Sequence, residues 1–215
     1  MKHYLNLDAI TDLQSAIDEV IELKKNPYAS EDLGRQKTLG MLFFNPSLRT
    51  RLSTQKAAQH LGLKTMIMNF SNESWALEFE DGNKMSGLRS EHIKEAAAVV
   101  SQYCNIVAIR AFASLDDKEK DEKEQVLKSF ARYTSIPVIN MESATAHPLQ
   151  ALADAVTIRE QLFTKRPKIV LTWAPHPKAL PHAVGNSFTK MAQKLDAEFV
   201  ITQTKCYELN QKITR

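Results

Sequence analysis

Several features that mark common classes of protein are missing from this sequence. Only 6 of the 215 residues are glycine, and neither a G-x-G-x-x-G run nor a G-x-x-x-x-G-K run follows an apolar stretch, which excludes the common nucleotide-binding motifs. The G-x-S-x-G turn that presents the catalytic serine of α/β hydrolases is absent as well. The two cysteines, Cys104 and Cys206, have neither metal-site nor disulfide spacing. We therefore expect two free thiols in a reducing compartment.

Signals for a membrane or for secretion are also missing. No apolar run approaches the length of a membrane span, and the residues after Met1 contain no apolar core of a signal peptide. The net charge of +3 is too small to indicate a nucleic-acid-binding face. These absences favour a cytoplasmic protein whose partners include neither a membrane nor a nucleic acid.

The chain alternates between apolar runs and stretches with helical periodicity. The apolar runs predict strands at residues 39–44, 65–70, 105–112, 136–141, 168–173 and 198–202. The periodic stretches predict helices at residues 8–25, with Asp8 as the N-cap, and at 52–61, 92–104, 116–133, 148 onward and 186–194. Residues 71–89 have no clear periodicity, and so long a loop is usually functional or mobile.

This alternation indicates an α/β fold, because continuous apolar strands are typical of parallel sheets that are buried on both faces. We expect two Rossmann-like lobes whose parallel sheets are covered by helices on both faces. The first lobe is predicted at residues 1–146. The second is predicted at residues 147–215 and is incomplete within them.

The junction between the first predicted strand and the following helix has an unusual composition. Residues Ser47-Leu48-Arg49-Thr50-Arg51 place hydroxyl groups and two arginines in the first helical turn. Cations are normally disfavoured there, because the helix dipole already makes the N-terminus positive. Free backbone N–H groups, hydroxyls and arginines together suit a multiply charged anion such as phosphate. The alternative is an ordinary solvated helix start in which Ser47 is the N-cap.

Polar side chains also lie at the ends of other predicted strands. Arg110 ends the third strand, Glu142 follows the fourth, His147 opens the next helix beside Pro148, and His176 follows the fifth strand. Ligands of α/β folds bind at the carboxyl ends of the strands. We therefore expect these side chains to meet residues 47–51 at one edge of the sheet. The alternatives are a surface arginine, a solvated carboxylate and a capping histidine.

The expected position of His147 bears on its charge. A helix N-terminus disfavours protonation, so the imidazole should be neutral and able to bind a carbonyl oxygen. A zinc site formed by His147, His176 and His182 is an alternative. No paired histidine or cysteine spacing supports it, so we expect no metal.

Two segments resemble the signatures of a known family. Residues 44–51, Phe-Asn-Pro-Ser-Leu-Arg-Thr-Arg, resemble the carbamoyl-phosphate motif of the transcarbamylases, and residues 147–154, His-Pro-Leu-Gln-Ala-Leu-Ala-Asp, resemble their second signature. Leu48, Ser-Trp-Ala-Leu-Glu at 74–78 and Trp-Ala-Pro-His-Pro at 173–177 favour the N-acylornithine branch. The resemblance covers essentially the whole chain. It implies two α/β lobes and a homotrimer whose active sites are shared between subunits.

The resemblance implies roles for the residues at matching positions. Carbamoyl phosphate would be bound by Ser47, Leu48, Arg49, Thr50, Trp75, Arg110, His147, Pro148, Leu149 and Gln150, with Trp75 reaching the site of a neighbouring subunit. The catalytic residues would be Arg49, Thr50, Arg110 and His147. Glu142 and His176 would contact the acylornithine, and Ser90 would lie where the branch selects its acyl group.

The implied reaction transfers the carbamoyl group of carbamoyl phosphate to the δ-amino group of an N2-acyl-L-ornithine in arginine biosynthesis. The products are N-acyl-L-citrulline and phosphate, and the N-succinyl acceptor is favoured over the N-acetyl acceptor. The reaction needs no cofactor and no metal. Family members continue beyond residue 215 with further acceptor-site residues. One alternative is therefore a non-catalytic anion-binding or assembly module that retains only the carbamoyl-phosphate site. Another is a nucleic-acid binder, which predicts binding that weakens steeply with salt.

Overall fold

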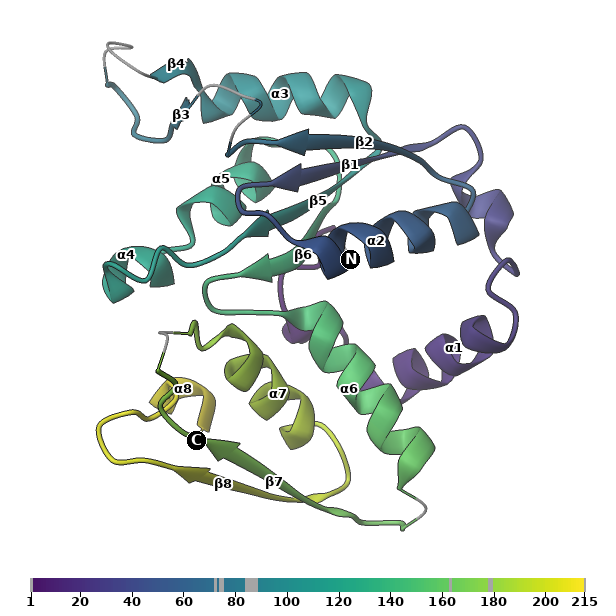
Figure 1. Cartoon of the computed structure of the whole chain (residues 1–215). Helices are drawn as coiled ribbons and strands as arrows, with labels where there is room; N and C mark the ends of the chain where they lie inside the picture. Colours follow the sequence, from purple (N-terminus) through teal and green to yellow (C-terminus); the bar gives the residue numbers. More distant parts are fainter. Residues whose placement is uncertain are drawn as a thin grey trace.

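A four-stranded parallel sheet forms the centre of the larger part of the molecule (Figure 1). The structure is a computed structural model that describes residues 2–71, 73, 76–83, 89–162, 164–177 and 180–214. The strand order is β2-β1-β5-β6, and the strands are β1 (Thr38–Phe43), β2 (Lys64–Asn69), β5 (Ile106–Ala111) and β6 (Val138–Ser143). Every neighbouring pair in this sheet is parallel, as the sequence predicted.

Helices cover both faces of this sheet. On one face α3 (Ile93–Tyr103) and α5 (Gln125–Tyr133) pack on Leu42, Val107 and Ile109. On the other face α2 (Leu48–His60) contributes Ala58 to a cluster with Met41. Successive residues of a strand point to opposite faces, so both Met41 and Leu42 become buried. This two-sided burial explains why the strands are continuously apolar and confirms the expected α/β class.

Another hydrophobic cluster joins an N-terminal segment to two helices that come much later in the sequence. Two short 3-10 helices, η1 (Leu7–Ala9) and η2 (Glu31–Gly34), flank α1 (Leu13–Lys25). Residues of η1 and α1 pack with α6 (Pro148–Gln161) and α7 (Ala183–Gln193). The predicted division between residues 146 and 147 falls in the turn that joins β6 to α6, and it stays a prediction.

A separate two-stranded parallel sheet follows α6. It consists of β7 (Lys168–Trp173) and β8 (Glu198–Gln203), and α7 packs against it (Figure 1). The last helix, α8 (Gln211–Thr214), contacts α7. The side chain of Val170 on β7 is 51% exposed.

The predicted helix ends differ in how well they agree with the structure. Ser47 is the N-cap of α2, and Gly62 follows the helix with a φ of 70°, a conformation that glycine adopts without strain. The prediction that Asp8 caps the first long helix was wrong. Asp12 caps α1 by accepting a hydrogen bond from the Ser15 N–H, and Asp8 lies inside η1.

The predicted single helix at residues 116–133 is also corrected. The structure has two helices there, α4 (Lys118–Glu122) and α5, separated by Glu124 in the left-handed conformation with a φ of 49°. The Glu124 carboxylate accepts hydrogen bonds from the Ser143 hydroxyl and from the Thr145 N–H. A contact with a distant turn therefore coincides with the break in the helix.

The stretch at 71–89, for which no element was predicted, contributes to a small parallel sheet of β3 (Ala76–Glu78) and β4 (Arg89–His92). The Glu78 carboxylate accepts hydrogen bonds from the Glu80 and Phe79 N–H groups and pairs with Arg89 at 2.8 Å. The Glu80 N–H, the Arg89 side chain and the Phe79 N–H, in that order, lower the pKa of Glu78 to about 2.

The helices that the structure describes include none with the length and apolar character that a membrane span requires.

The packing predicts which aromatic residues stabilise the fold. Phe130 of α5 is 0% exposed, so Phe130→Ala should lower the free energy of unfolding by about 3 to 5 kcal/mol. Tyr103 of α3 is 67% exposed, and Tyr103→Ala should change the free energy of unfolding by about 1 kcal/mol or less. Equilibrium urea denaturation of both variants measures the difference. Equal losses for the two variants would contradict the assigned core.

Candidate functional site

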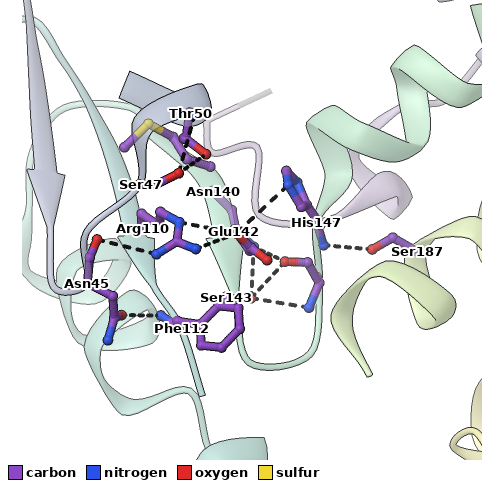
Figure 2. Close-up of polar contacts among 12 residues, drawn as sticks. Asn45, Ser47, Thr50, Arg110, Phe112, Asn140, Glu142, Ser143, His147 and Ser187 are labelled. Atoms are coloured by element: carbon purple, nitrogen blue, oxygen red, sulfur yellow. Dashed lines mark hydrogen bonds and ion pairs between the residues drawn. The ribbon is translucent and has the colours of Figure 1, made fainter. Parts of the chain in front are cut away.

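A buried ion pair lies at the carboxyl ends of β5 and β6 (Figure 2). Arg110 is 8% exposed, and its Nε and Nη2 lie 3.1 Å and 2.9 Å from Oε2 of Glu142. The register of the two strands shifts after Ile109, so that Arg110 stands opposite Glu142 and not opposite Met141. This irregularity brings the two charges together. Arg110 is therefore not a surface arginine, and Glu142 is not a solvated loop residue but part of β6.

The same guanidinium holds the turn that follows β1. Nη1 of Arg110 donates hydrogen bonds to the carbonyl oxygens of Asn45 and Pro46, each at 3.3 Å. The Asn45 side chain in turn accepts a 2.7 Å hydrogen bond from the Phe112 N–H. Both contacts tie the turn between β1 and α2 to the end of β5. They fix the start of α2 beside the ion pair (Figure 2).

The start of α2 combines a hydroxyl cap with free cations. The Ser47 hydroxyl accepts a hydrogen bond from the Thr50 N–H and lies 2.9 Å from the Thr50 hydroxyl. Arg49 and Arg51 are exposed and form no ion pair with a carboxylate of the described part of the chain. The geometry therefore contains features of both interpretations, and anion binding stays a prediction. Ser47 is the N-cap, and two unpaired cations lie beside the positive end of the helix.

His147 lies on the other side of Glu142. Its Nε2 is 4.0 Å from Oε2 of Glu142, and its side chain is 16% exposed. Burial lowers the pKa of His147, the Glu142 carboxylate partly opposes this effect, and the Arg110 guanidinium adds to it. The direction agrees with the expected neutral imidazole, although burial is the main cause. His147 occupies the N-cap position of α6, but its side chain makes no capping hydrogen bond, and its buried Nδ1 has no partner among the described residues.

The other predicted site residues occupy more open positions. Leu48 is 74% exposed, and Leu149 and Gln150 are exposed in the first turn of α6, where Gln150 donates to Asp154. Pro148 is the buried first residue of α6. His176 is exposed after β7, and Ser90 is exposed on β4. Trp75 lies outside the described residues. The roles assigned to all of these residues stay predictions.

A hydrogen-bond network that the sequence did not indicate supports the turn between β6 and α6. The Asn140 amide donates to the carbonyl oxygens of Leu5 and Ala146 and to the Ser143 hydroxyl. The Ser187 hydroxyl of α7 accepts a 2.8 Å hydrogen bond from the His147 N–H. Polar residues at buried strand and helix positions were the available signal, but their partners are distant in the sequence.

The zinc alternative is not supported by the geometry. Within the described ranges, no three histidine, cysteine, aspartate or glutamate side chains lie close enough together to hold a metal ion. His147, His176 and His182 all belong to these ranges.

The fold and the site together define an α/β protein whose polar site lies at the carboxyl edge of a parallel sheet. Residues 2–160 match the model of the family described as aspartate/ornithine carbamoyltransferase, carbamoyl-P binding domain. The chain belongs to the aspartate/ornithine carbamoyltransferase family.

Two relatives that match nearly the whole chain are N-acylornithine carbamoyltransferases. The chain is 48% identical over 97% of its length to an N-succinylornithine carbamoyltransferase of Bacteroides thetaiotaomicron. It is 38% identical over 99% of its length to an N-acetylornithine carbamoyltransferase of Xanthomonas axonopodis pv. citri. It spans 66% and 63% of the lengths of these two relatives.

A solved structure is similar over the same range. It is a single-residue mutant of an N-acetyl-L-ornithine transcarbamylase complexed with carbamyl phosphate and N-succinyl-L-norvaline, which shares 37% identity and a TM-score of 0.91 with this chain. The match covers 99% of this chain and 65% of that structure.

The lowered pKa of His147 predicts a contribution to acid destabilisation. Below about pH 6.5 His147 binds a proton in the unfolded chain more readily than in the folded protein, because burial lowers its pKa in the folded state. The free energy of unfolding therefore falls as the pH falls. Between pH 8 and pH 5.5, the free energy of unfolding should therefore fall more for the unmodified protein than for His147→Asn, by up to about 1.4 kcal/mol.

Urea denaturation at several pH values measures this difference. At pH 8 residue 147 is neutral in both proteins. The difference between their free energies of unfolding at that pH therefore serves as the internal reference. His3 and His182, whose pKa values burial also lowers, contribute equally to both proteins. Identical pH profiles would contradict the assigned environment of His147.

Proposed function

We propose that the protein transfers the carbamoyl group of carbamoyl phosphate to the δ-amino group of an N2-acyl-L-ornithine. The observation that carries the proposal is the chain of contacts from the start of α2 through Arg110 and Glu142 to His147. This chain joins exposed cations at a helix N-terminus, which suit a phosphate, to a buried carboxylate and a neutral imidazole. Membership of the family supports it, as do the ligands named for the solved neighbour.

In the proposed reaction the neutral δ-amine attacks the carbonyl carbon of carbamoyl phosphate. A C–N bond forms, the C–O bond to the phosphate breaks and the departing phosphate takes up the proton that the nitrogen loses, so that N-acyl-L-citrulline and phosphate leave. Negative charge develops on the carbonyl oxygen and on the departing phosphate. Donors that are already in place stabilise this charge, and each typically contributes about 3 to 4 kcal/mol in the transition state.

The described contacts favour a division of roles among these donors. The hydroxyls and N–H groups at the start of α2 bind the phosphate with Arg49, while Thr50, Arg110 and His147 face the carbonyl oxygen. The contacts to Asn45, Pro46 and Glu142 leave one N–H of the Arg110 Nη2 for a ligand. Leu48, Pro148, Leu149 and Gln150 complete the carbamoyl-phosphate site in this proposal.

Glu142 and His176 orient the acceptor in the proposal. Arg110 contacts only Oε2 of Glu142, and Oε1 has no hydrogen bond within the described part of the chain. A free carboxylate oxygen beside the ion pair suits an amino or amide N–H of the acylornithine. His176 lies three residues beyond the end of β7, on the acceptor side of the predicted division.

We further propose a homotrimer in the cytoplasm that serves arginine biosynthesis, with Trp75 entering the site of a neighbouring subunit. Leu48 and Leu52 of α2 are 74% and 59% exposed and lie one helical turn apart, which suits a surface covered by another copy. Both cysteines are free thiols, which suits a reducing compartment. Sedimentation velocity of the purified protein tests the trimer, and a monomer at micromolar concentration would exclude it.

The proposed role of Arg49 predicts a large loss of activity without a loss of stability. Arg49→Ala should lower kcat/KM for carbamoyl phosphate by about 100-fold or more, because one preorganised donor to the phosphate is removed. The side chain is exposed and has no partner among the residues that the structure describes, so the unfolding midpoint should stay unchanged. The assay follows the release of phosphate and of acylcitrulline.

Arg35→Ala is the matched control for this variant. Arg35 is an exposed arginine that precedes β1 at the opposite edge of the sheet, so its loss should leave turnover unchanged. Normal turnover of Arg49→Ala would reject the assigned role. Binding of carbamoyl phosphate by calorimetry, with no product from any acylornithine, would favour the non-catalytic module instead.

The acyl group of the acceptor is proposed to be N-succinyl, with Ser90 contributing to the choice. A succinyl group carries a carboxylate that an acetyl group lacks, and the higher identity to an N-succinylornithine relative supports this choice. Ser90→Glu should lower kcat/KM for N-succinylornithine by about 10-fold relative to N-acetylornithine, because two carboxylates then repel each other. Competition assays with both acceptors measure the ratio, and Ser90→Gln is the neutral control. An unchanged ratio in Ser90→Glu would remove Ser90 from the acyl site.

A further inference from the structure

The turn 143–147, which joins β6 to α6, carries His147 into the site but does not hold its imidazole. The buried Nδ1 of His147 has no hydrogen-bond partner among the described residues, and Nε2 lies 4.0 Å from the Glu142 carboxylate. No side-chain hydrogen bond to the described residues therefore fixes the ring. Apart from the packing around it, the position of the ring depends on the backbone of the turn.

That backbone is held from two sides. On the sheet side, the Glu124 carboxylate accepts the Thr145 N–H at 3.1 Å, and the Asn140 amide donates to the Ala146 carbonyl oxygen at 3.4 Å. On the other side, α7 supplies two neighbouring residues. Ser187 accepts the His147 N–H at 2.8 Å, and the Asn186 amide donates to the Thr145 carbonyl oxygen at 3.2 Å.

The two α7 residues are buried, so their hydrogen bonds cannot readily be replaced by water. Ser187 is 4% exposed and Asn186 is 5% exposed. Losing one partner of a buried hydrogen bond leaves the other unsatisfied, and a local shift of the chain relieves the resulting cost in free energy. The segment that would lose its support from α7 is the turn that bears His147, which lies beside Ser187 in Figure 2.

We infer that Ser187, assisted by Asn186, is a positioning residue that sets the place of the His147 imidazole from α7. Ser187 acts through the His147 N–H and is not itself assigned a contact with substrate. The inference about position rests on the contacts alone, whereas its effect on turnover rests on the proposed function. It makes a helix on the acceptor side of the predicted division part of the support of the carbamoyl-phosphate site.

The first measurement uses the unmodified protein and requires no turnover. If Ser187 binds the His147 N–H, this amide should exchange its hydrogen at least about 100-fold more slowly than the exposed amides of other turns, because exchange requires local opening. Hydrogen exchange followed by NMR gives the rate. Exchange as fast as in an exposed turn would overturn the inference.

The second measurement compares two variants that each delete a buried hydroxyl from α7. Ser187→Ala removes the contact to the turn. Thr189→Val is the matched control, because the Thr189 hydroxyl is 0% exposed and donates only to the Gly185 carbonyl oxygen within the same helix. NMR titration of the His147 ring, assigned with His147→Asn, is the readout.

Ser187→Ala should raise the pKa of His147 toward its ordinary value, because a displaced ring becomes more hydrated. Thr189→Val should leave the pKa unchanged. The charged groups that act on the ring are Glu142, Arg110 and Asp154, and neither variant changes them. Equal titration curves for the two variants, with both folded, would overturn the inference.

Turnover gives a separate readout. Ser187→Ala should lower kcat by about 10- to 100-fold with little change in KM, because a small misplacement of one donor weakens the transition state more than substrate binding. Thr189→Val should keep normal kcat. If the unmodified protein has no carbamoyltransferase activity, the proposed function fails, while exchange and titration still decide the position of His147. If Ser187→Ala does not fold, the exchange rate in the unmodified protein decides alone.

Discussion

The Arg110–Glu142 ion pair is the interaction on which the rest of the site depends. Two buried charges are tolerated only when they are paired and their remaining hydrogen-bonding groups are satisfied. The strand irregularity after Ile109 meets the first condition, because it brings Glu142 opposite Arg110. The carbonyl oxygens of Asn45 and Pro46 help to meet the second. One guanidinium therefore fixes the ends of β5 and β6 and the turn after β1. Removing either charge would leave the other buried without compensation.

This pairing also decides where the free positive charge of the site lies. Glu142 neutralises Arg110, so Arg110 acts mainly as a directed donor and as a tie between segments. The uncompensated charges are Arg49 and Arg51, which are exposed in the first turn of α2. There they add to the positive end of the helix dipole, an arrangement that a helix normally avoids. An anion bound between these charges would make the arrangement favourable. Because the two arginines are exposed, the attraction between them and an anion would depend on the salt concentration.

Local patterns predicted much of the fold. Each of the six strands predicted from apolar runs lies within two residues of an observed strand, and Ser47 caps α2 as one of the two interpretations required. Local patterns failed where a distant contact decides the structure. Glu124 interrupts a charged helical stretch where its carboxylate binds Ser143 and Thr145. The shift in register that aligns Arg110 with Glu142 depends on how two strands pair, which neither strand reveals alone. Asp8 was predicted as a cap because aspartate is a good capping residue, but Asp12 caps α1, and only the path of the chain separates the two.

The distinction between local patterns and contacts with distant residues also explains which site residues could be predicted from the sequence. Arg49 and Arg51 are exposed and have no partner within the described residues, so their side chains are accessible to a ligand. Asn140, Ser143, Glu124 and Ser187 instead direct their polar groups at the backbone of the turn 143–147. Such residues look like ordinary polar positions in a sequence, because their partners become apparent only in the fold. A buried polar atom without a hydrogen bond costs free energy. Nδ1 of His147 carries this cost, as do the side-chain oxygens of Asn140 and Asn186, so the turn 143–147 is held by hydrogen bonds that leave some buried polar atoms of the same region without a hydrogen bond to the described residues.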